Sequence, residues 1–318
     1  MDWDATEVAR RFGLGRATHL SDGPVARGKQ GLVWRLETSD GRWAVKVPLR
    51  RTSEAEVRLP TEFNEQAWAA GVPTPKVRRT EEGSVLAVVG AAQVRVHEWV
   101  DLLPPDPMLD PGRVGALLGD LHQVVLEAPG PSHAWNHEPV GAARWDELVR
   151  RLSAGGAPFA GRVADLRDEL VALESWLEPP RDLQVCHCDL WADNVLSTTD
   201  GDVCVIDWDN SGPADPHHEL ACALFEFARS DPGRVRELVA AYRDAGGPAA
   251  VERRGHFTML IAQLGHITEL AACDWLEPNR RSPRREDAEA WISEVFDDPH
   301  TRSVLDRLLA AVRQLRDP

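Results

Sequence analysis

The 318-residue sequence is poor in lysine, with only Lys29, Lys46 and Lys76 among its 36 basic residues. Acidic residues number 51, which gives a formal net charge of -15 at pH 7. A surface of that sign repels phosphate backbones and attracts cationic solutes, so we expect no nucleic-acid partner. Because arginine supplies nearly all the positive charge, each lysine that is kept is more informative than usual.

The chain also lacks a basic segment followed by an apolar one at its start, and it has no apolar run long enough to span a membrane. Its five cysteines are odd in number and form no disulfide framework, which suits a reducing compartment. We therefore expect a cytoplasmic protein with no membrane contact. Cys186 and Cys188 flank His187 too closely for an ordinary Cys-x-x-Cys zinc site.

The two parts of the chain differ in their predicted elements. Residues 1 to 100 predict mostly antiparallel strands with one helix over 54–70, in which Pro60 stands where a helix could begin. From Pro111 onward helical patterns dominate, and only the segment 183–209 interrupts them with short β-rich runs. These patterns predict an α+β fold with two lobes.

The segment from His187 to Asn194 fits the pattern H-x-D-L-x-x-x-N of a kinase catalytic loop at every fixed position. Phosphoryl transfer needs a carboxylate beside the attacking hydroxyl and oxygen ligands for the metal ion on the phosphates. Asp189 and Asn194 can supply these from one loop, and a strand over 203–206 delivers Asp207 as a second magnesium ligand. The alternative is a polar loop in which the spacing arises by chance.

The order and spacing of three motifs resemble the aminoglycoside phosphotransferase family of the protein-kinase-like superfamily. They are His187 to Asn194, Ile206 to Asp209 and Gly212 to Leu220, which are similar to that family's catalytic loop, metal aspartate and following Asp-Pro motif. The resemblance implies transfer of the γ-phosphoryl group of ATP or GTP to a hydroxyl, with Mg²⁺ bound by Asn194 and Asp207 and Asp189 as the catalytic residue.

The resemblance also implies a protein-kinase-like bilobal fold of the α+β class. Its N-terminal nucleotide-binding lobe, residues 1–98, would hold a small antiparallel β-sheet and one main helix. A hinge at about 97–101 would lead to a larger, mainly helical C-terminal lobe, 99–318, with the catalytic loop and the acceptor site. At this hinge the backbone of Glu98 and Val100 would meet the purine.

Lys46 stands in a strand, after Ala44 and Val45, where kinase-like folds place the lysine that holds the α- and β-phosphates. Its expected ionic partner is a glutamate of the following helix, either Glu62, our first choice, or Glu65. The preceding turn, Arg27 to Gly31, departs from G-x-G-x-x-G. Backbone N–H groups near Gln30 and Gly31 can still contact phosphates.

Gln263, His266 and Glu269 share one helical face at spacings of three, and they either line an acceptor pocket or form a polar stripe. The acidic balance favours an aminoglycoside or similar cationic antibiotic as acceptor, and hence a role in antibiotic resistance. A macrolide, a sugar, or a choline- or homoserine-like metabolite would use the same loop and metal ligands.

Two further hypotheses differ in class. The first is a catalytically silent nucleotide-binding pseudokinase, against which the joint presence of Lys46, Asp189, Asn194 and Asp207 argues. The second is a metal hydrolase, which would need no nucleotide; its candidate ligands would be His187, Asp189, Asp207 and Asp209. The sequence does not determine the oligomeric state.

Overall fold

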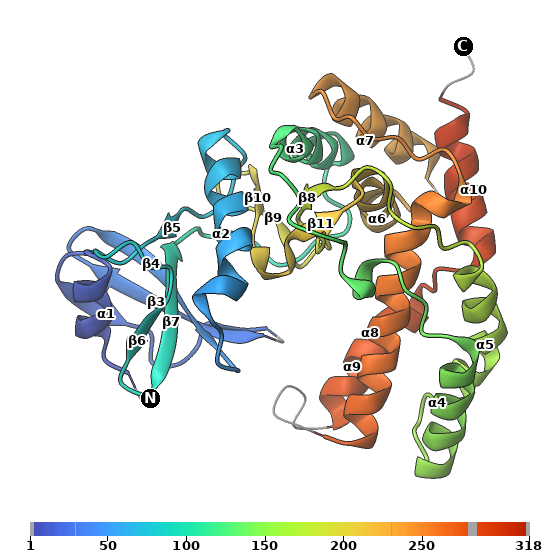
Figure 1. The fold of residues 1–318 in the computed structure, drawn as a ribbon, viewed down its shortest axis with the longest axis horizontal. Helices are drawn as coiled ribbons and strands as arrows, with labels where there is room; N and C mark the ends of the chain where they lie inside the picture. Colours follow the sequence, from blue (N-terminus) through green and yellow to red (C-terminus); the bar gives the residue numbers. More distant parts are fainter. Residues whose placement is uncertain (1–2, 29, 230, 279–284, 316–318) are drawn as a thin grey trace. The chain divides into compact units, whose positions relative to one another are not determined.

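The structure, a computed structural model, describes residues 3–28, 30–229, 231–278 and 285–315. It divides into two compact units, the first made of Met1–Pro105 with Asn194–Ser211 and the second of Asp106–Asp193 with Gly212–Pro318. Lys29 of the predicted phosphate-contacting turn lies outside the described residues. The predicted α+β class is confirmed: strands dominate the first unit and helices the second (Figure 1).

One antiparallel sheet forms the body of the first unit. Its central strands follow the order β1-β3-β4-β7-β5, while β2 pairs with β3 and β6 pairs with β7. The bounds are β1 Ala17–Leu20, β2 Ala26–Arg27, β3 Gly31–Thr38, β4 Gly41–Pro48, β5 Val77–Arg78, β6 Ala87–Val89 and β7 Ala92–Glu98. Residues of β3, β4, β6 and β7 pack with the short helix α1 (Ala5–Arg11) into one apolar core.

The main helix of this unit, α2 (Glu54–Ala69), starts at a capping box. Ser53 accepts a hydrogen bond from the Glu56 N–H, and Glu56 accepts one from the Ser53 N–H, so two otherwise unpaired donors are satisfied. The helix therefore begins before Pro60, which lies buried inside it. The predicted helix over 54–70 is confirmed to within one residue, and its start is set by the capping box, six residues before Pro60.

A β-hairpin over residues 195–205, almost a hundred residues after the sheet in the sequence, packs with the first unit. Its strands β9 (Val195–Ser197) and β10 (Val203–Val205) are antiparallel, and the turn η2 (Trp208–Asn210) follows. The Val205 N–H donates to Pro73 O at 2.9 Å, and Trp208 donates to Thr74 Oγ1 and packs its ring edge-on against Phe63. The sequence assigned this hairpin to the second lobe, whereas these contacts join it to the first unit.

The second unit is a group of helices with one small sheet, in which β8 (Gln184–Cys186) pairs with β11 (Gly212–Ala214). The helices are α3 Pro111–Gln123, α4 Ala142–Gly155, α5 Ala160–Glu174, α6 Pro216–Ala228, α7 Pro232–Asp244, α8 Thr258–Leu276, α9 Arg285–Asp297 and α10 Arg302–Arg313, with short turns η1 Ala134–Asn136 and η3 Arg254–Phe257. Long α8 lies beside α9 (Figure 1). Within the described ranges, none of these helices combines the length and apolar character needed to cross a membrane.

Helices α3 and α7 approach closely through two glycines one turn apart. A Cβ atom on Gly115 would come within 2.2 Å of the Leu238 carbonyl oxygen, and one on Gly119 within 2.7 Å of the Tyr242 carbonyl oxygen. Because both obstacles are backbone atoms of α7, they cannot turn aside as a side chain could. The glycines thus set the helix spacing that supports His122 near the end of α3.

We predict that Gly115→Ala lowers the free energy of unfolding by about 2 kcal/mol or more, because the helices must separate. Urea denaturation measures the change. Gly161→Ala is the matched control, since a Cβ at Gly161, in the first turn of α5, meets nothing within 4 Å. An equal effect of the two substitutions would contradict this account of the α3–α7 contact.

Candidate active site

Lys46 and Arg95 lie on neighbouring strands and share the carboxylates of one short segment. They are register partners on β4 and β7, so their side chains leave the same face of the sheet. Lys46 Nζ donates to Asp207 Oδ1 at 2.6 Å and to Asp209 Oδ2 at 2.7 Å, and Arg95 Nη2 donates to Asp209 Oδ2 at 2.5 Å. With Lys46 only 14% and Arg95 only 9% exposed, these side chains form a mostly buried cluster of two cations and two carboxylates.

Lys46 and Asp209 stay ionised because of the opposite charges beside them. Burial would lower the pKa of Lys46, but Asp207 and Asp209 outweigh it and raise that pKa. Burial also opposes ionisation of Asp209, yet Lys46 and Arg95 hold the pKa of its carboxyl well below its usual range. Lys46 is therefore a permanent positive charge, which suits its predicted role of binding phosphate.

The predicted partners of Lys46 on α2 are elsewhere in the structure. The ion pairs of Lys46 run to Asp207 and Asp209, while Glu65 binds Arg79 through both carboxylate oxygens, at 2.7 and 2.8 Å. Glu62 is half-buried and also acts on Arg79 electrostatically. The structure therefore does not show the expected pairing of Lys46 with Glu62 or Glu65. The carboxylates of Asp207 and Asp209 compensate the charge of Lys46 instead.

The turn before β3 lies against Lys46. A Cβ on Gly31 would approach the Val47 carbonyl oxygen to 3.0 Å and two carbons of the Lys46 side chain to 3.5 Å, which explains a glycine at this place. Gln30 is exposed and donates through Nε2 to Asn210 Oδ1 at 3.0 Å. The turn and the segment after β10 therefore meet beside the lysine.

The two predicted hinge residues lie at the end of β7. Glu98 is the last residue of that strand, and its N–H donates to the Lys76 carbonyl oxygen at 2.9 Å. Val100 follows two residues later, and both side chains are half-buried. Their part in binding a purine stays a prediction.

The β9–β10 hairpin brings Asn194 and Asp207 to the same end. Val195 and Val205 are register partners, and the Ile206 N–H donates to the Asn194 carbonyl oxygen at 2.9 Å. Asn194 therefore directly precedes β9, and only Ile206 separates Asp207 from the end of β10. Carboxylate and amide oxygens are the hard ligands that Mg²⁺ prefers, so these residues fit a divalent metal ion.

Asp189 belongs to the second unit, where it follows β8 in the predicted catalytic loop and is half-buried. The preceding residue, Cys188, has a φ of 62°, in the left-handed region. A residue other than glycine pays about 1–2 kcal/mol for that conformation and keeps it only where its surroundings hold it. The path of the backbone into Asp189 is thus imposed by neighbouring elements.

Two of the three predicted acceptor residues meet in one polar group. His266 Nδ1 lies 3.5 Å from Glu269 Oε2, and the His266 ring stacks on Trp135 with ring centres 5.0 Å apart. Arg144 donates to Glu269 Oε1 at 2.6 Å. The hydrogen bond from His266 lowers the pKa of Glu269, and Arg144 adds to this effect against the opposing effect of burial. Arg144 and Trp135 were not predicted from the sequence.

The third predicted acceptor residue, Gln263, is placed differently. It is only 4% exposed, and its Nε2 donates to Asn136 Oδ1 at 3.0 Å and to the Cys188 carbonyl oxygen at 2.8 Å. The Gln263 amide group is therefore bound to the backbone of the predicted catalytic loop at Cys188. The shared helical face suggested one role for three residues, but burial separates Gln263 from His266 and Glu269.

The sequence reasoning missed Arg95 and gave Asp209 a role only in the hydrolase hypothesis. Arg95 stands in the buried centre of β7, between the apolar residues Val94 and Val96. A charged residue inside such a strand is a usable signal, because a buried charge needs a partner. The identity of that partner depends on strand register, which the sequence did not provide.

A sheet that carries an ion-paired lysine, followed in sequence by a helical unit with the H-x-D loop and a strand leading to Asp207, is the arrangement of kinase-like small-molecule phosphotransferases. Enzymes of this class use ATP together with a divalent metal ion. A family model described as the phosphotransferase enzyme family matches residues 23–257. The chain belongs to this family and is a small-molecule phosphotransferase.

Individual relatives agree with this class. The chain is 28% identical over 231 residues to a homoserine kinase of Methylocella silvestris, covering 70% of the chain and 68% of that enzyme. It is 30% identical over 196 residues to a homoserine kinase of Methylorubrum populi, covering 59% of each. A spectinomycin phosphotransferase solved with ADP and spectinomycin has a TM-score of 0.68 and 14% identity over 96% of the chain and 97% of its own, which shows a shared fold.

We predict that Asp209→Asn lowers the free energy of unfolding at pH 7 by about 2 kcal/mol, because it removes a carboxylate from two mostly buried cations. The folded-state pKa of Asp209 is depressed, so its contribution is present above the unfolded-state pKa and is lost as the pH falls. The difference from wild type should therefore narrow below about pH 4. Urea unfolding of the variant and of the wild type, at pH values above and below about pH 4, measures this difference in free energy.

The exposed Asp200, in the turn between β9 and β10, provides the control substitution Asp200→Asn. It removes the same charge outside the cluster and should change stability little. A deficit in Asp209→Asn that stays constant from about pH 4 down to about pH 2 would contradict the ion-pair explanation.

Proposed function

We propose that this protein transfers the γ-phosphoryl group of ATP or GTP directly to a hydroxyl group of a small molecule that carries an amino group. The observation that carries the proposal is the combination of the buried, ionised Lys46 with Asp207 at its side and a complete H-x-D-L-x-x-x-N loop. Family membership supports the reaction class.

Each proposed role follows from the chemistry of the side chain. Asp189 accepts the proton of the acceptor hydroxyl and orients its oxygen. Lys46 binds phosphate oxygens, and Asn194 and Asp207 would hold Mg²⁺. When bound, this ion neutralises charge on the phosphates. Backbone groups near Gln30 and Gly31 would contact the phosphates, and those of Glu98 and Val100 would contact the base. No covalent phosphoenzyme is needed.

An aminoglycoside or similar cationic antibiotic is the first acceptor that we propose. The net charge of -15 favours a cationic solute. Glu269 and the stacked rings of His266 and Trp135 provide a carboxylate and an aromatic face, which are the groups that bind ammonium ions in proteins. Phosphorylation of such an antibiotic would give this protein a role in antibiotic resistance.

A homoserine-like amino acid is the second candidate. The curated relatives at 28% and 30% identity are homoserine kinases. In addition, Arg144 and Glu269 place a cation beside an anion, a pair that complements the carboxylate and the ammonium group of an amino acid. This candidate uses the same catalytic loop and the same metal ligands.

A consumption assay with ATP and with GTP would decide between these acceptors. The panel should contain aminoglycosides, spectinomycin, macrolides, homoserine, choline and simple sugars, with Mg²⁺ as the metal ion. We expect turnover with one amine-bearing class and none with sugars lacking an amine. Nucleotide binding without turnover of any panel member would favour the pseudokinase hypothesis, and absence of magnesium-dependent nucleotide binding would reject both kinase-fold hypotheses.

We predict that Asp189→Asn and Asp207→Asn separate catalysis from nucleotide binding. Asp189→Asn should lower kcat by about a thousandfold because the general base is lost, with the affinity for Mg·AMP-PNP unchanged. Asp207→Asn should weaken that affinity by about tenfold or more, because it removes a charged metal ligand. Calorimetry and initial rates measure the two effects. Near-normal turnover in the first variant, or unaltered affinity in the second, would reject the corresponding role.

A further inference from the structure

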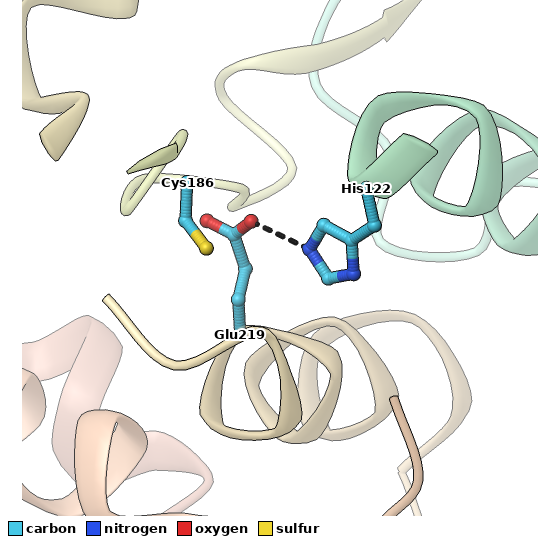
Figure 2. Close-up of side chains that lie close together, drawn as sticks. All are labelled: His122, Cys186 and Glu219. Carbon is cyan, nitrogen blue, oxygen red and sulfur yellow. Dashed lines mark hydrogen bonds and ion pairs between the residues drawn. The ribbon is translucent and has the colours of Figure 1, made fainter. Parts of the chain in front are cut away.

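A buried polar group lies beneath the catalytic loop in the second unit. His122 of α3, Cys186 of β8 and Glu219 of α6 bring their side-chain N, S and O atoms within 4.8 Å of one another (Figure 2). This residue set is one that could bind a metal ion. Glu219 is 1% and His122 0% exposed at the side chain, so a carboxylate here needs strong compensation.

Hydrogen bonds already use the atoms that a metal ion would need. Glu219 Oε2 lies 2.9 Å from His122 Nε2, and Glu219 Oε1 accepts the Cys188 N–H at 2.5 Å. His122 Nδ1 lies 2.8 Å from the Tyr242 hydroxyl oxygen. Burial, together with the nearby charge of Glu219, raises the pKa of the Cys186 thiol, so this sulfur stays protonated. The group therefore acts as a hydrogen-bond network.

The proton positions in this network follow from Tyr242. Its hydroxyl oxygen accepts the Ala249 N–H at 2.9 Å, and its single proton can be donated to His122 Nδ1. The ring proton of His122 is then on Nε2 and is donated to Glu219. Burial would raise the pKa of Glu219, but the hydrogen bonds from His122 and Cys188 outweigh it and lower that pKa. Glu219 is thus an anion that accepts from both sides.

The catalytic loop is attached to α6 at a second point. Glu226 Oε1 accepts the Ala192 N–H at 3.2 Å, and Glu226 lies seven residues after Glu219 on the same helix. Seven residues are about two turns, so both carboxylates leave the same face of α6. The two N–H groups that they bind belong to Cys188 and Ala192, which stand on either side of Asp189 in the sequence.

A third attachment comes from α8. Gln263 Nε2 donates to the Cys188 carbonyl oxygen, while Glu219 accepts the N–H of the same residue. Cys188, in its left-handed conformation with φ 62°, is therefore held at both its backbone donor and its backbone acceptor. Rotation of either neighbouring peptide would break one of these bonds.

We propose that Glu219, together with Glu226 and Gln263, positions the catalytic base by fixing the backbone on both sides of Asp189. Glu219 is the main positioning residue, because its anionic carboxylate holds the strained residue directly before Asp189 and is itself oriented by His122. These residues touch the loop and not the reacting atoms. The proposal rests on the proposed function of Asp189.

Glu219→Gln tests this role with little change of shape. The new amide group must present its NH₂ to either His122 Nε2–H or the Cys188 N–H, so two donors face each other. We expect kcat to fall by about ten- to a hundredfold, as a misplacement of about 1 Å can cost. The affinity for Mg·AMP-PNP should stay within about twofold, because the phosphate-binding residues are untouched.

Glu169→Gln is the matched control. Glu169 of α5 is also a carboxylate that accepts a backbone N–H, that of Arg302 at 2.5 Å, and it also binds the Arg302 guanidinium. This substitution should cost some stability and leave kcat unchanged. If Glu219→Gln keeps kcat within about twofold of wild type, or if Glu169→Gln lowers kcat as much, the positioning role is overturned.

Amide hydrogen exchange over residues 187–194 tests the attachment without any phosphoryl transfer. In the wild-type chain the Cys188 and Ala192 N–H groups should exchange slowly, and in Glu219→Gln this segment should exchange at least about tenfold faster. If no acceptor is turned over, the proposed function fails, but unchanged exchange is still the result that would overturn the attachment. Should Glu219→Gln not fold, Gln263→Met and Glu226→Gln carry the same two measurements, because each removes one attachment of the loop.

Discussion

Two mostly buried positive charges, Lys46 and Arg95, need negative partners, and Asp207 and Asp209 supply them. This requirement links strands β4 and β7 to the β9–β10 hairpin. In the sequence, this hairpin begins almost a hundred residues after the last strand of the sheet. Without the segment that follows this hairpin, Lys46 and Arg95 would lose the carboxylates that compensate their charges. Charge compensation therefore explains why the segment 194–211 belongs to the first compact unit.

Two of the described residues other than glycine that have positive φ lie in the sequence motifs: Cys188, directly before the proposed catalytic residue Asp189, and Asp207, a proposed metal ligand. Each is held by a different means. Asp207 is held through its side chain by Lys46 and through the adjoining hairpin. Cys188 is held through its backbone by α6 and α8. At both places, residues that are distant in the sequence maintain the strained backbone.

Family membership and local chemistry agree on the reaction class but differ in what they say about the acceptor. The catalytic loop and the metal ligands are common to kinases with many acceptors, so they carry no information on the molecule that is phosphorylated. The groups that we propose as acceptor contacts, Trp135, His266, Arg144 and Glu269, come from separate helices and turns.

The sequence by itself determined the fold class, the order of the helices and strands, and the identities of Asp189, Asn194 and Asp207 as candidates. These depend on local patterns, such as residue periodicity and the spacing of a short loop. The tertiary structure alone decided the partners: Lys46 pairs with Asp207 and Asp209 rather than with Glu62 or Glu65, and Gln263 binds the Cys188 backbone. Partners of buried charges and amides are set by strand register and helix packing, which join residues that are far apart in the chain.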